Sequence, residues 1–286
     1  MAVGRPVGGV SGARGLHDFL RSVAVIGVSV GAFTDVGMVR SLNEDHYYVG
    51  THIWLVADGM GGHAAGEVAS EIVVDTLRSL DRDHLEQQQI VDAVMAANSE
   101  VLAYGRAHPE ARGLGSTVTG LARIDIGGAE HWAVFNVGDS RVYREYGGVL
   151  SRATVDHSEV EELILQGVIT AEQARWHAFR SVVTRSIGTE PPPQVDVWVF
   201  PQTPGERFIV CSDGLVAELD DGDLQSILNR SADAESAARA LLDAACEAGG
   251  SDNISVIVVA VAADERAEVE EITNPRSHLN VEVTSE

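Results

Sequence analysis

Apolar residues recur along this chain with two different spacings, and the spacing changes from segment to segment. Runs that are apolar throughout or at alternate positions predict β-strands at 23–33, 47–49, 53–57, 116–126, 131–137, 140–146, 194–200, 206–212 and 254–261. Apolar residues three or four positions apart predict two amphipathic helices, through Val68, Ile72, Val73, Leu77 and Leu80 and through Ile90, Val91, Val94, Met95, Val101 and Leu102. Further helices are expected at 222–229 and 234–247, and a more polar helical segment at 158–178.

This order of elements indicates an α+β fold. Long β-rich stretches with helices grouped in pairs favour two packed sheets with helices outside them, rather than a doubly wound parallel sheet. Residues 1–21 lack periodicity and predict a flexible leader, and residues 263–286 predict an acidic tail. No repeat or low-complexity block interrupts residues 22–262, so we expect one domain there.

Acidic residues stand at the ends of several predicted strands. Asp58, Asp139 and Asp213 each end or follow an apolar run and have a glycine neighbour, and Asp252 opens the last strand. Glu44 and Asp45 precede another strand. A single Asp-Gly is typical of a turn, but four such carboxylates beside apolar runs favour a shared site. Because carboxylates brought to one sheet edge repel each other, bound divalent cations would relieve the repulsion.

The ligand type limits the choice of ion. The candidate donors are carboxylate oxygens, and a glycine beside them lets a backbone carbonyl approach as a further oxygen ligand. Hard ions prefer such oxygens, so we expect Mn²⁺ or Mg²⁺ before Zn²⁺.

One glycine pattern competes with this interpretation. Gly59-x-Gly61-x-x-Ala64 follows a strand and precedes a helix, which satisfies a relaxed dinucleotide-binding fingerprint. That fingerprint requires an acidic residue at the end of the next strand, about 20 positions later. Here Asp75 and Asp81 lie in a helical segment, and Asp58 would repel a pyrophosphate. The sequence therefore disfavours nucleotide binding.

Charge and composition exclude several functions. The chain has 286 residues with 20 basic and 43 acidic side chains, a net charge of −23 that argues against nucleic acid as a partner. All 20 cations are arginine, which excludes chemistry that needs a lysine, such as the phosphate-loop and Schiff-base lysines. Neither Cys211 nor Cys246 belongs to a C-x-x-C pair, so we expect no disulfide scaffold and a reducing, cytoplasmic location.

No apolar run approaches the roughly 18 residues that a membrane span requires, so no membrane association is expected. Residues 23–30, after Arg14 and Arg21, could imitate the apolar part of a signal peptide. Cleavage there would remove the first predicted strand, which disfavours secretion.

Six motifs occur in the order and spacing of a known family. They are Arg40-x-x-Asn43-Glu44-Asp45, Asp58-Gly59-Met60-Gly61-Gly62-His63, Gly115-Ser116-Thr117, Val137-Gly138-Asp139-Ser140-Arg141, Ser212-Asp213-Gly214 and Ser251-Asp252-Asn253. Together they resemble the metal-dependent PPM-type (protein phosphatase 2C-like) serine/threonine protein phosphatases, over residues 22–262. Asp156-His157-Ser158 and the residues that follow resemble the flap of bacterial members, at about 154–190.

The resemblance implies a four-layer α-β-β-α sandwich of two mostly antiparallel sheets, with a metal cluster at one edge. By position, Asp58 would bridge two core ions and the Gly59 carbonyl would be a ligand. Asp213 and Asp252 would hold the first ion, and Asp139 with Asp213 a third, weaker one. Glu44 and Asp45 would act through metal-bound water.

The resemblance also implies the reaction, hydrolysis of phosphoserine and phosphothreonine by in-line attack of a metal-bridging hydroxide. Arg40 matches the phosphate-binding arginine, the alternative being a surface ion pair with Glu44. His63 is the candidate that protonates the leaving alkoxide. Animal-type members have a histidine at the position of Met60, so the proton donor is less well defined than the metal ligands.

The sequence leaves alternatives open for the protein substrates and for the activity. Phosphorylated Ser/Thr kinases and anti-sigma-pathway proteins are both expected partners, and the motifs do not separate them. A degenerate member that only binds phosphoproteins would lack metal carboxylates, and all those expected are present. A cysteine-based phosphatase is excluded, because Ala217 and Asp252, not arginines, lie six positions after the two cysteines.

Overall fold

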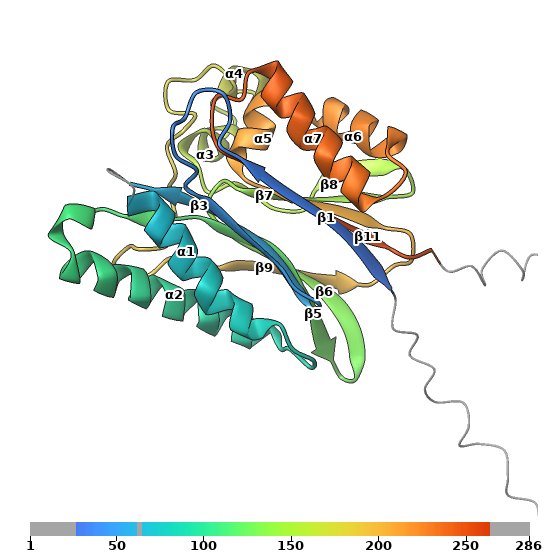
Figure 1. Ribbon diagram of the computed structural model, residues 1–286, viewed down its shortest axis with the longest axis horizontal. Helices are drawn as coiled ribbons and strands as arrows, with labels where there is room; N and C mark the ends of the chain where they lie inside the picture. The colour runs from blue at the N-terminus through green and yellow to red at the C-terminus, as the bar shows by residue number, and fades with distance from the viewer. Residues whose placement is uncertain (1–26, 62–64, 264–286) are drawn as a thin grey trace, which may run out of the picture.

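Two antiparallel sheets packed face to face form the centre of the structure, a computed structural model that describes residues 27–61 and 65–263. Helices cover the outer face of each sheet, which gives the expected four-layer α-β-β-α arrangement (Figure 1). The predicted leader and almost all of the predicted acidic tail lie outside the described residues, so the domain boundaries stay predictions. No helix within the described ranges combines the length and the apolar character of a membrane span.

Within residues 27–61 and 65–263, one sheet has five strands and the other has six. The first has the order β1 (Val28–Asp35), β11 (Ile254–Val261), β10 (Arg207–Cys211), β7 (Arg141–Tyr146) and β8 (Val149–Arg152). The second has the order β2 (Asp45–Val49), β3 (Ile53–Met60), β5 (Val118–Ile126), β6 (Ala129–Val137) and β9 (Asp196–Pro201), with β4 (Gly115–Ser116) paired to the end of β3.

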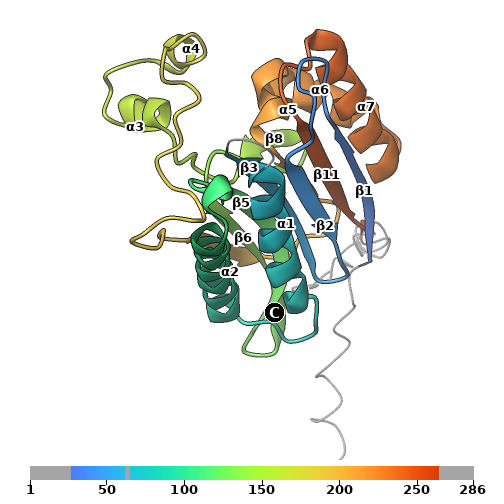
Figure 2. The ribbon, with the colours of Figure 1, turned by 60° about the vertical axis from the view of Figure 1, so that its left-hand side comes forward.

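The helices fall into three groups. α1 (Ala65–Leu77), η1 (Arg78–Leu80), α2 (Gln87–Ala107) and η2 (Pro109–Ala111) lie on the second sheet. α5 (Asp213–Glu218), α6 (Asp221–Arg230) and α7 (Ala234–Ala248) lie on the first. α3 (Glu159–Leu165) and α4 (Ala171–Ala174) belong to the flap, which stands away from the sandwich in Figure 2.

Strands in the middle of the sandwich are buried on both faces, and side chains alternate between two apolar layers. In β3, Ile53, Leu55 and Ala57 pack under α1 and α2, while Trp54 and Val56 face the other sheet. Because both faces of such a strand are apolar, its sequence is a continuous apolar run rather than an alternating one. This is why the central strands could be predicted from the sequence.

Three elements have no counterpart in the sequence prediction, namely β8, α5 and the short 3-10 helix η2. β8 is four residues long and follows β7 through Gly147 and Gly148, both at positive φ, as a tight hairpin turn requires. The Gly-Gly pair was the available signal for this hairpin. The α5 helix has only six residues, too few to establish a helical period. The polar helical segment predicted at 158–178 contains two short helices, α3 and α4.

Antiparallel pairing brings the acidic strand ends to one edge. The Cα of Asp45, where β2 begins, pairs with that of Asp58 near the end of β3. The end of β10 lies beside the beginnings of β11 and β7, where Cys211 pairs with Val256 and Arg141. Residues just outside these strand ends, including Asp139, Asp213 and Asp252, therefore gather at the same edge of the sandwich.

The opposite end contains a buried charge with a structural role. Glu206 is fully buried, and its carboxylate accepts hydrogen bonds from Trp132 Nε1, from Arg144 Nε at 2.7 Å and from the Thr203 N–H at 2.8 Å. The Glu206 carbonyl accepts from Val261 N–H at the end of β11. This carboxylate therefore ties both sheets together away from the acidic edge.

We predict that Glu206→Gln lowers the free energy of unfolding by about 1–3 kcal/mol, because it removes charge-assisted hydrogen bonds that water cannot replace at a buried site. Urea denaturation measures the change. The exposed Glu110→Gln should stay within about 0.5 kcal/mol of the parent protein. An equal loss in both variants would contradict the role given to Glu206.

Candidate metal centre

Carboxylates from both sheets converge at the acidic edge. Asp58 of β3 interacts electrostatically with Asp45, Asp139, Asp213 and Asp252. These side chains come from strand ends and loops that are far apart in sequence and adjacent only because of the strand pairing. The structure thus brings together all four strand-end aspartates singled out in the sequence, and adds Asp45 to them.

Asp45 is the most buried acid of this group. It is 5% exposed, and within the described part of the chain neither carboxylate oxygen has a hydrogen-bond partner of ordinary geometry. The hydroxyl groups of Ser212 and Ser255 lie nearby and favour the ionised form. Burial, opposed by these hydroxyls but reinforced by Asp213 and Asp252, raises the pKa of Asp45 to about 7. Two buried acceptor oxygens without donors are costly unless something else satisfies them.

The other carboxylates are perturbed in the same direction. Burial, with Asp213 and Asp156 as neighbouring charges, raises the pKa of Asp139 to about 8, although Arg141 opposes the shift. Burial and then the charges of Asp45 and Asp213 raise the pKa of Asp58 well above its usual range. The pKa of Asp213 is also raised, by burial and by Asp252. The cluster is therefore short of positive charge.

The donor set fits hard divalent cations. It consists of oxygen atoms, it concentrates negative charge in a buried place, and it includes the partnerless oxygens of Asp45. In the described ranges, no three Asp, Glu, His or Cys side chains form a finished coordination shell. The fit therefore rests on charge and donor type rather than on preformed coordination.

Polar residues of the neighbouring strands hold Asp58 in position. Its N–H donates to Thr117 Oγ1 at 3.0 Å, and its carbonyl accepts from Thr117 N–H at 2.8 Å and from the Ser116 hydroxyl at 3.0 Å. Thr117 Oγ1 also lies 2.8 Å from Ser140 Oγ, next to Asp139. The Gly115-Ser116-Thr117 motif thus links two acidic strand ends, a role that its sequence did not reveal.

Gly59 occupies a position that allows no side chain. A Cβ built there would lie 2.1 Å from the Gly66 carbonyl oxygen and 2.6 Å from that of Glu44. The Gly59 N–H donates to the Glu44 carbonyl at 3.1 Å. Only glycine lets the start of α1 and the residue before β2 approach β3 this closely.

Arg40 lies beside the cluster, in the loop between β1 and β2. Its Nη2 forms an ion pair with Asp252 Oδ2 at 2.7 Å, and half of its side chain is exposed. Its partner is therefore a candidate metal ligand, and not Glu44 as the alternative interpretation of the sequence assumed. His63 lies outside the described residues.

Asn253 fixes this loop and was given no role from the sequence. Its Oδ1 accepts from the Glu44 N–H at 2.9 Å. Its Nδ2 donates to the carbonyls of Val36 at 3.0 Å and Leu42 at 2.9 Å. One amide side chain thus positions Arg40 and Glu44 relative to the neighbouring Asp252. In the sequence, the only indication of this role is that Asn253 directly follows the candidate ligand Asp252.

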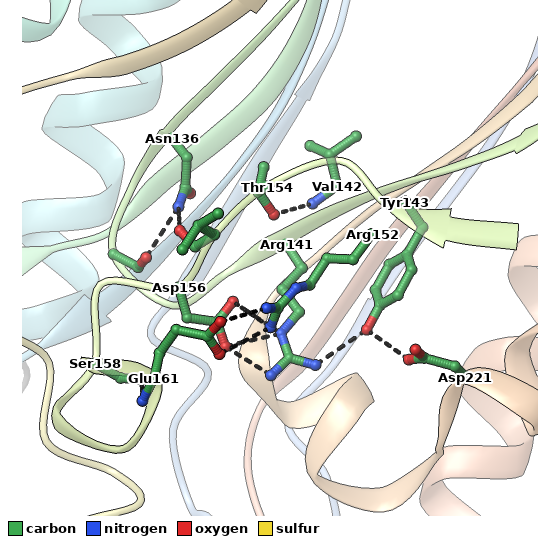
Figure 3. A network of polar contacts seen from close by, with 12 residues as sticks. Asn136, Arg141, Val142, Tyr143, Arg152, Thr154, Asp156, Ser158, Glu161 and Asp221 are labelled. Carbon is green, nitrogen blue, oxygen red and sulfur yellow. Dashed lines mark hydrogen bonds and ion pairs between the residues drawn. The ribbon is translucent and has the colours of Figure 1, made fainter. Parts of the chain in front are cut away.

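A cavity of about 840 Å³ extends from Asp139 and Asp213 to the flap. Ion pairs line it: Arg141 binds Asp156 with Nη2 to Oδ2 at 2.6 Å, and Arg152 binds Glu161 of α3 at 2.6 Å (Figure 3). The acidic edge therefore opens onto a space large enough for a peptide segment, bounded by the flap on the other side.

The protein phosphatase 2C family model matches residues 40–249. The serine/threonine protein phosphatase PstP of Mycobacterium tuberculosis is 37% identical over 234 residues, which are 80% of this chain and 44% of that protein. This chain thus spans less than half of PstP. The serine/threonine phosphatase stp of Listeria innocua is 32% identical over 241 residues, 79% of this chain and 93% of that protein.

Solved structures agree with these relatives. A crystal structure of M. tuberculosis PstP has a TM-score of 0.75 at 34% identity and covers 82% of this chain and 99% of its own. The PstP catalytic domain in complex with two manganese ions has a TM-score of 0.73 at 33% identity, covering 82% and 98%. Since the family model spans most of the chain and the fold and motif order agree with it, this chain belongs to the protein phosphatase 2C family.

Proposed function

We propose that this chain is a metal-dependent phosphatase that hydrolyses phosphoserine and phosphothreonine in proteins. The single observation that carries the proposal is the buried carboxylate cluster. In the described chain, only Arg40, which pairs with Asp252, and the nearby Arg141 offset its negative charge. Family membership and the serine/threonine phosphatases among its relatives support the substrate class.

The site residues receive these roles. Asp58 and the Gly59 carbonyl would hold the two core ions, and Asp213 and Asp252 would hold the first of them. Asp139 and Asp213, which interact electrostatically, would hold a third and weaker ion. Mn²⁺ and Mg²⁺ both suit these oxygen donors.

Glu44 and Asp45 act through bound water. Asp45 supports this role, because a water molecule held by a neighbouring ion would donate the hydrogen bonds that its two buried oxygens lack. The short backbone contact between Glu44 and Gly59 keeps Glu44 beside the proposed carbonyl ligand.

The reaction combines the ions with two side chains. When bound, two divalent ions lower the pKa of a shared water and stabilise charge on the phosphoryl oxygens. Arg40 binds the phosphoryl group, because its planar guanidinium has five N–H donors and the ion pair with Asp252 is made by Nη2 alone. His63 donates a proton to the departing serine or threonine oxygen.

The clients are phosphorylated proteins, either Ser/Thr kinases or proteins of an anti-sigma pathway. A net charge of −23 favours substrates whose phosphorylated residue has basic neighbours. We assign the activity to the cytoplasm, since Cys211 and Cys246 are both free thiols.

We predict hydrolysis of a phosphothreonine peptide with Mn²⁺ and its loss on addition of EDTA. Asp213→Asn should lower kcat by at least about two orders of magnitude, because losing an ion removes several kcal/mol of transition-state stabilisation. Circular dichroism should be unchanged.

The exposed Asp92→Asn on α2 serves as the matched control and should retain full activity. Release of phosphate measures both variants. A well-folded parent protein without activity at saturating Mn²⁺ or Mg²⁺ would contradict the proposed function.

The metal-free protein should become less stable as the pH rises. In the unfolded chain these carboxyls have a pKa of about 4. The folded state raises the pKa of Asp45 to about 7 and of Asp139 to about 8, so it binds protons more tightly than the unfolded state. Their contribution to stability is fully present below pH about 4 and is lost as the pH rises through these folded values.

A thermal-denaturation series on EDTA-treated protein tests this. The melting temperature should fall between about pH 5 and pH 9, and Mn²⁺ should raise it more at the alkaline end, where the carboxylates are ionised. Asp139→Asn should reduce the dependence on pH. A melting temperature that rises over this range would refute the assigned shifts.

His63→Ala should lose more rate on alkyl than on aryl phosphates, because an alkoxide needs a proton more than a phenolate does. Parallel kinetics with a phosphothreonine peptide and p-nitrophenyl phosphate measure the difference. Equal losses on the two substrates would rule out the proton-donor role.

A further inference from the structure

Three consecutive residues at the base of the flap, Val155, Asp156 and His157, form hydrogen bonds with the turn between β6 and β7 and with the residues beside it. We call this segment the clasp. The turn carries Asp139, and the clasp contacts residues on both sides of it. The sequence marks Asp156-His157-Ser158 as a motif, but the proposed chemistry gives it no task.

The first two clasp residues hold the two ends of the turn. Asn136 Nδ2 donates to the Val155 carbonyl at 3.1 Å and to the Gly138 carbonyl at 3.0 Å. The Asp156 carboxylate accepts from Arg141 Nε at 3.0 Å and from Arg141 Nη2 at 2.6 Å (Figure 3). Asp139 therefore lies between two fixed points.

The third clasp residue, His157, holds the middle of the turn. Its N–H donates to the Gly138 carbonyl at 2.9 Å, and its Nδ1 accepts from the Gly138 N–H at 3.1 Å. Because Nδ1 accepts, the ring proton belongs to Nε2, which lies 3.1 Å from Asp196 Oδ2. The hydrogen bonds thus assign one tautomer to a side chain that is only 4% exposed.

Among the described residues, His157 Nδ1 is the acceptor of the Gly138 N–H, which belongs to a tight turn. Gly138 is buried at a φ of +117°, and a Cβ there would lie 2.5 Å from Thr117 Cγ2. Without the His157 acceptor, this buried N–H would be unsatisfied, and the turn would have to move to reach water. The residue that would move with it is Asp139.

The two ring nitrogens of His157 have separate tasks. Nδ1 binds the turn, whereas Nε2 faces Asp196 of β9 and lies 3.1 Å from Arg185 Nη1 at the far end of the flap. Arg185 Nη1 also donates to Asp196 Oδ1 at 3.1 Å. With its proton, Nε2 donates to Asp196 and cannot accept from Arg185, so both side chains meet at the Asp196 carboxylate. Loss of the Nε2 hydrogen bond to Asp196 would loosen the flap without removing the acceptor for Gly138.

We propose that His157 is a positioning residue, whose Nδ1 holds Asp139 against Asp213 through the Gly138 N–H and so sets the affinity of this pair for a third divalent ion. The inference rests on the proposed function, because it takes Asp139 and Asp213 as ligands of that ion. Partners that orient a metal ligand typically change metal affinity on the order of 10–100-fold.

Two near-isosteric substitutions separate the two nitrogens. In His157→Asn the amide oxygen can replace the Nδ1 acceptor, and the contact with Asp196 is lost. In His157→Gln the amide nitrogen can replace the Nε2 donor, and the acceptor for Gly138 is lost. Calorimetric titration of the full chain with Mn²⁺ counts the ions and gives their affinities without reference to activity.

We expect His157→Gln to weaken the weakest ion on the order of tenfold or more, and His157→Asn to bind it like the parent protein. The two tighter ions should keep their affinities in both variants. Arg185→Gln is the matched control: it releases the flap end but leaves Nδ1 on Gly138, so the weakest ion should be unaffected.

The outcomes separate this inference from the proposed function. Weaker binding in His157→Asn or in Arg185→Gln, at the level of His157→Gln, would show that flap anchoring matters instead and would overturn the inference. His157→Asn decides the question even if His157→Gln does not fold. A parent protein that hydrolyses the phosphopeptide but binds no third ion overturns this inference alone, whereas absence of any hydrolysis overturns the proposed function.

Discussion

Mutual repulsion among buried carboxylates is the constraint on which this structure depends. Burial and neighbouring carboxylates raise the pKa of Asp45, Asp58, Asp139 and Asp213. A fold without a use for that charge would place such groups in water, where they cost nothing. We therefore infer that the small residues and tight turns at these strand ends keep the acids close together.

The sandwich supplies the rigidity that this arrangement requires. Its central strands are buried on both faces, so their register cannot slip without exposing apolar side chains. Register in turn fixes which residues follow each strand at the acidic edge. The buried charge of Glu206 at the opposite end is fully hydrogen-bonded, which is how a structural carboxylate differs from the partnerless oxygens of Asp45.

The side chains of one asparagine and one histidine fix the positions of loops and turns next to the acids. Asn253 ties the loop of Arg40 to Asp252, and His157 ties the flap base to the turn of Asp139. In both cases a polar residue near a carboxylate hydrogen-bonds backbone groups of another segment. Such contacts make the geometry of the acids depend on distant parts of the chain, including both ends of the flap.

The sequence by itself determined the layered α+β fold, nearly all strands and helices, and the acids that converge, because apolar periodicity and the Asp-Gly pattern are local properties. It did not reveal β8 and α5, which are too short for a period, although Gly147-Gly148 marked a hairpin turn. Only the tertiary structure decided that Asp45 is the most buried acid of the cluster, that Arg40 pairs with Asp252, and that Asn253 and His157 hold backbone groups in place. The hydrogen bonds among these contacts join residues from 19 to 212 positions apart, and they arise from the tertiary fold, which no local pattern encodes.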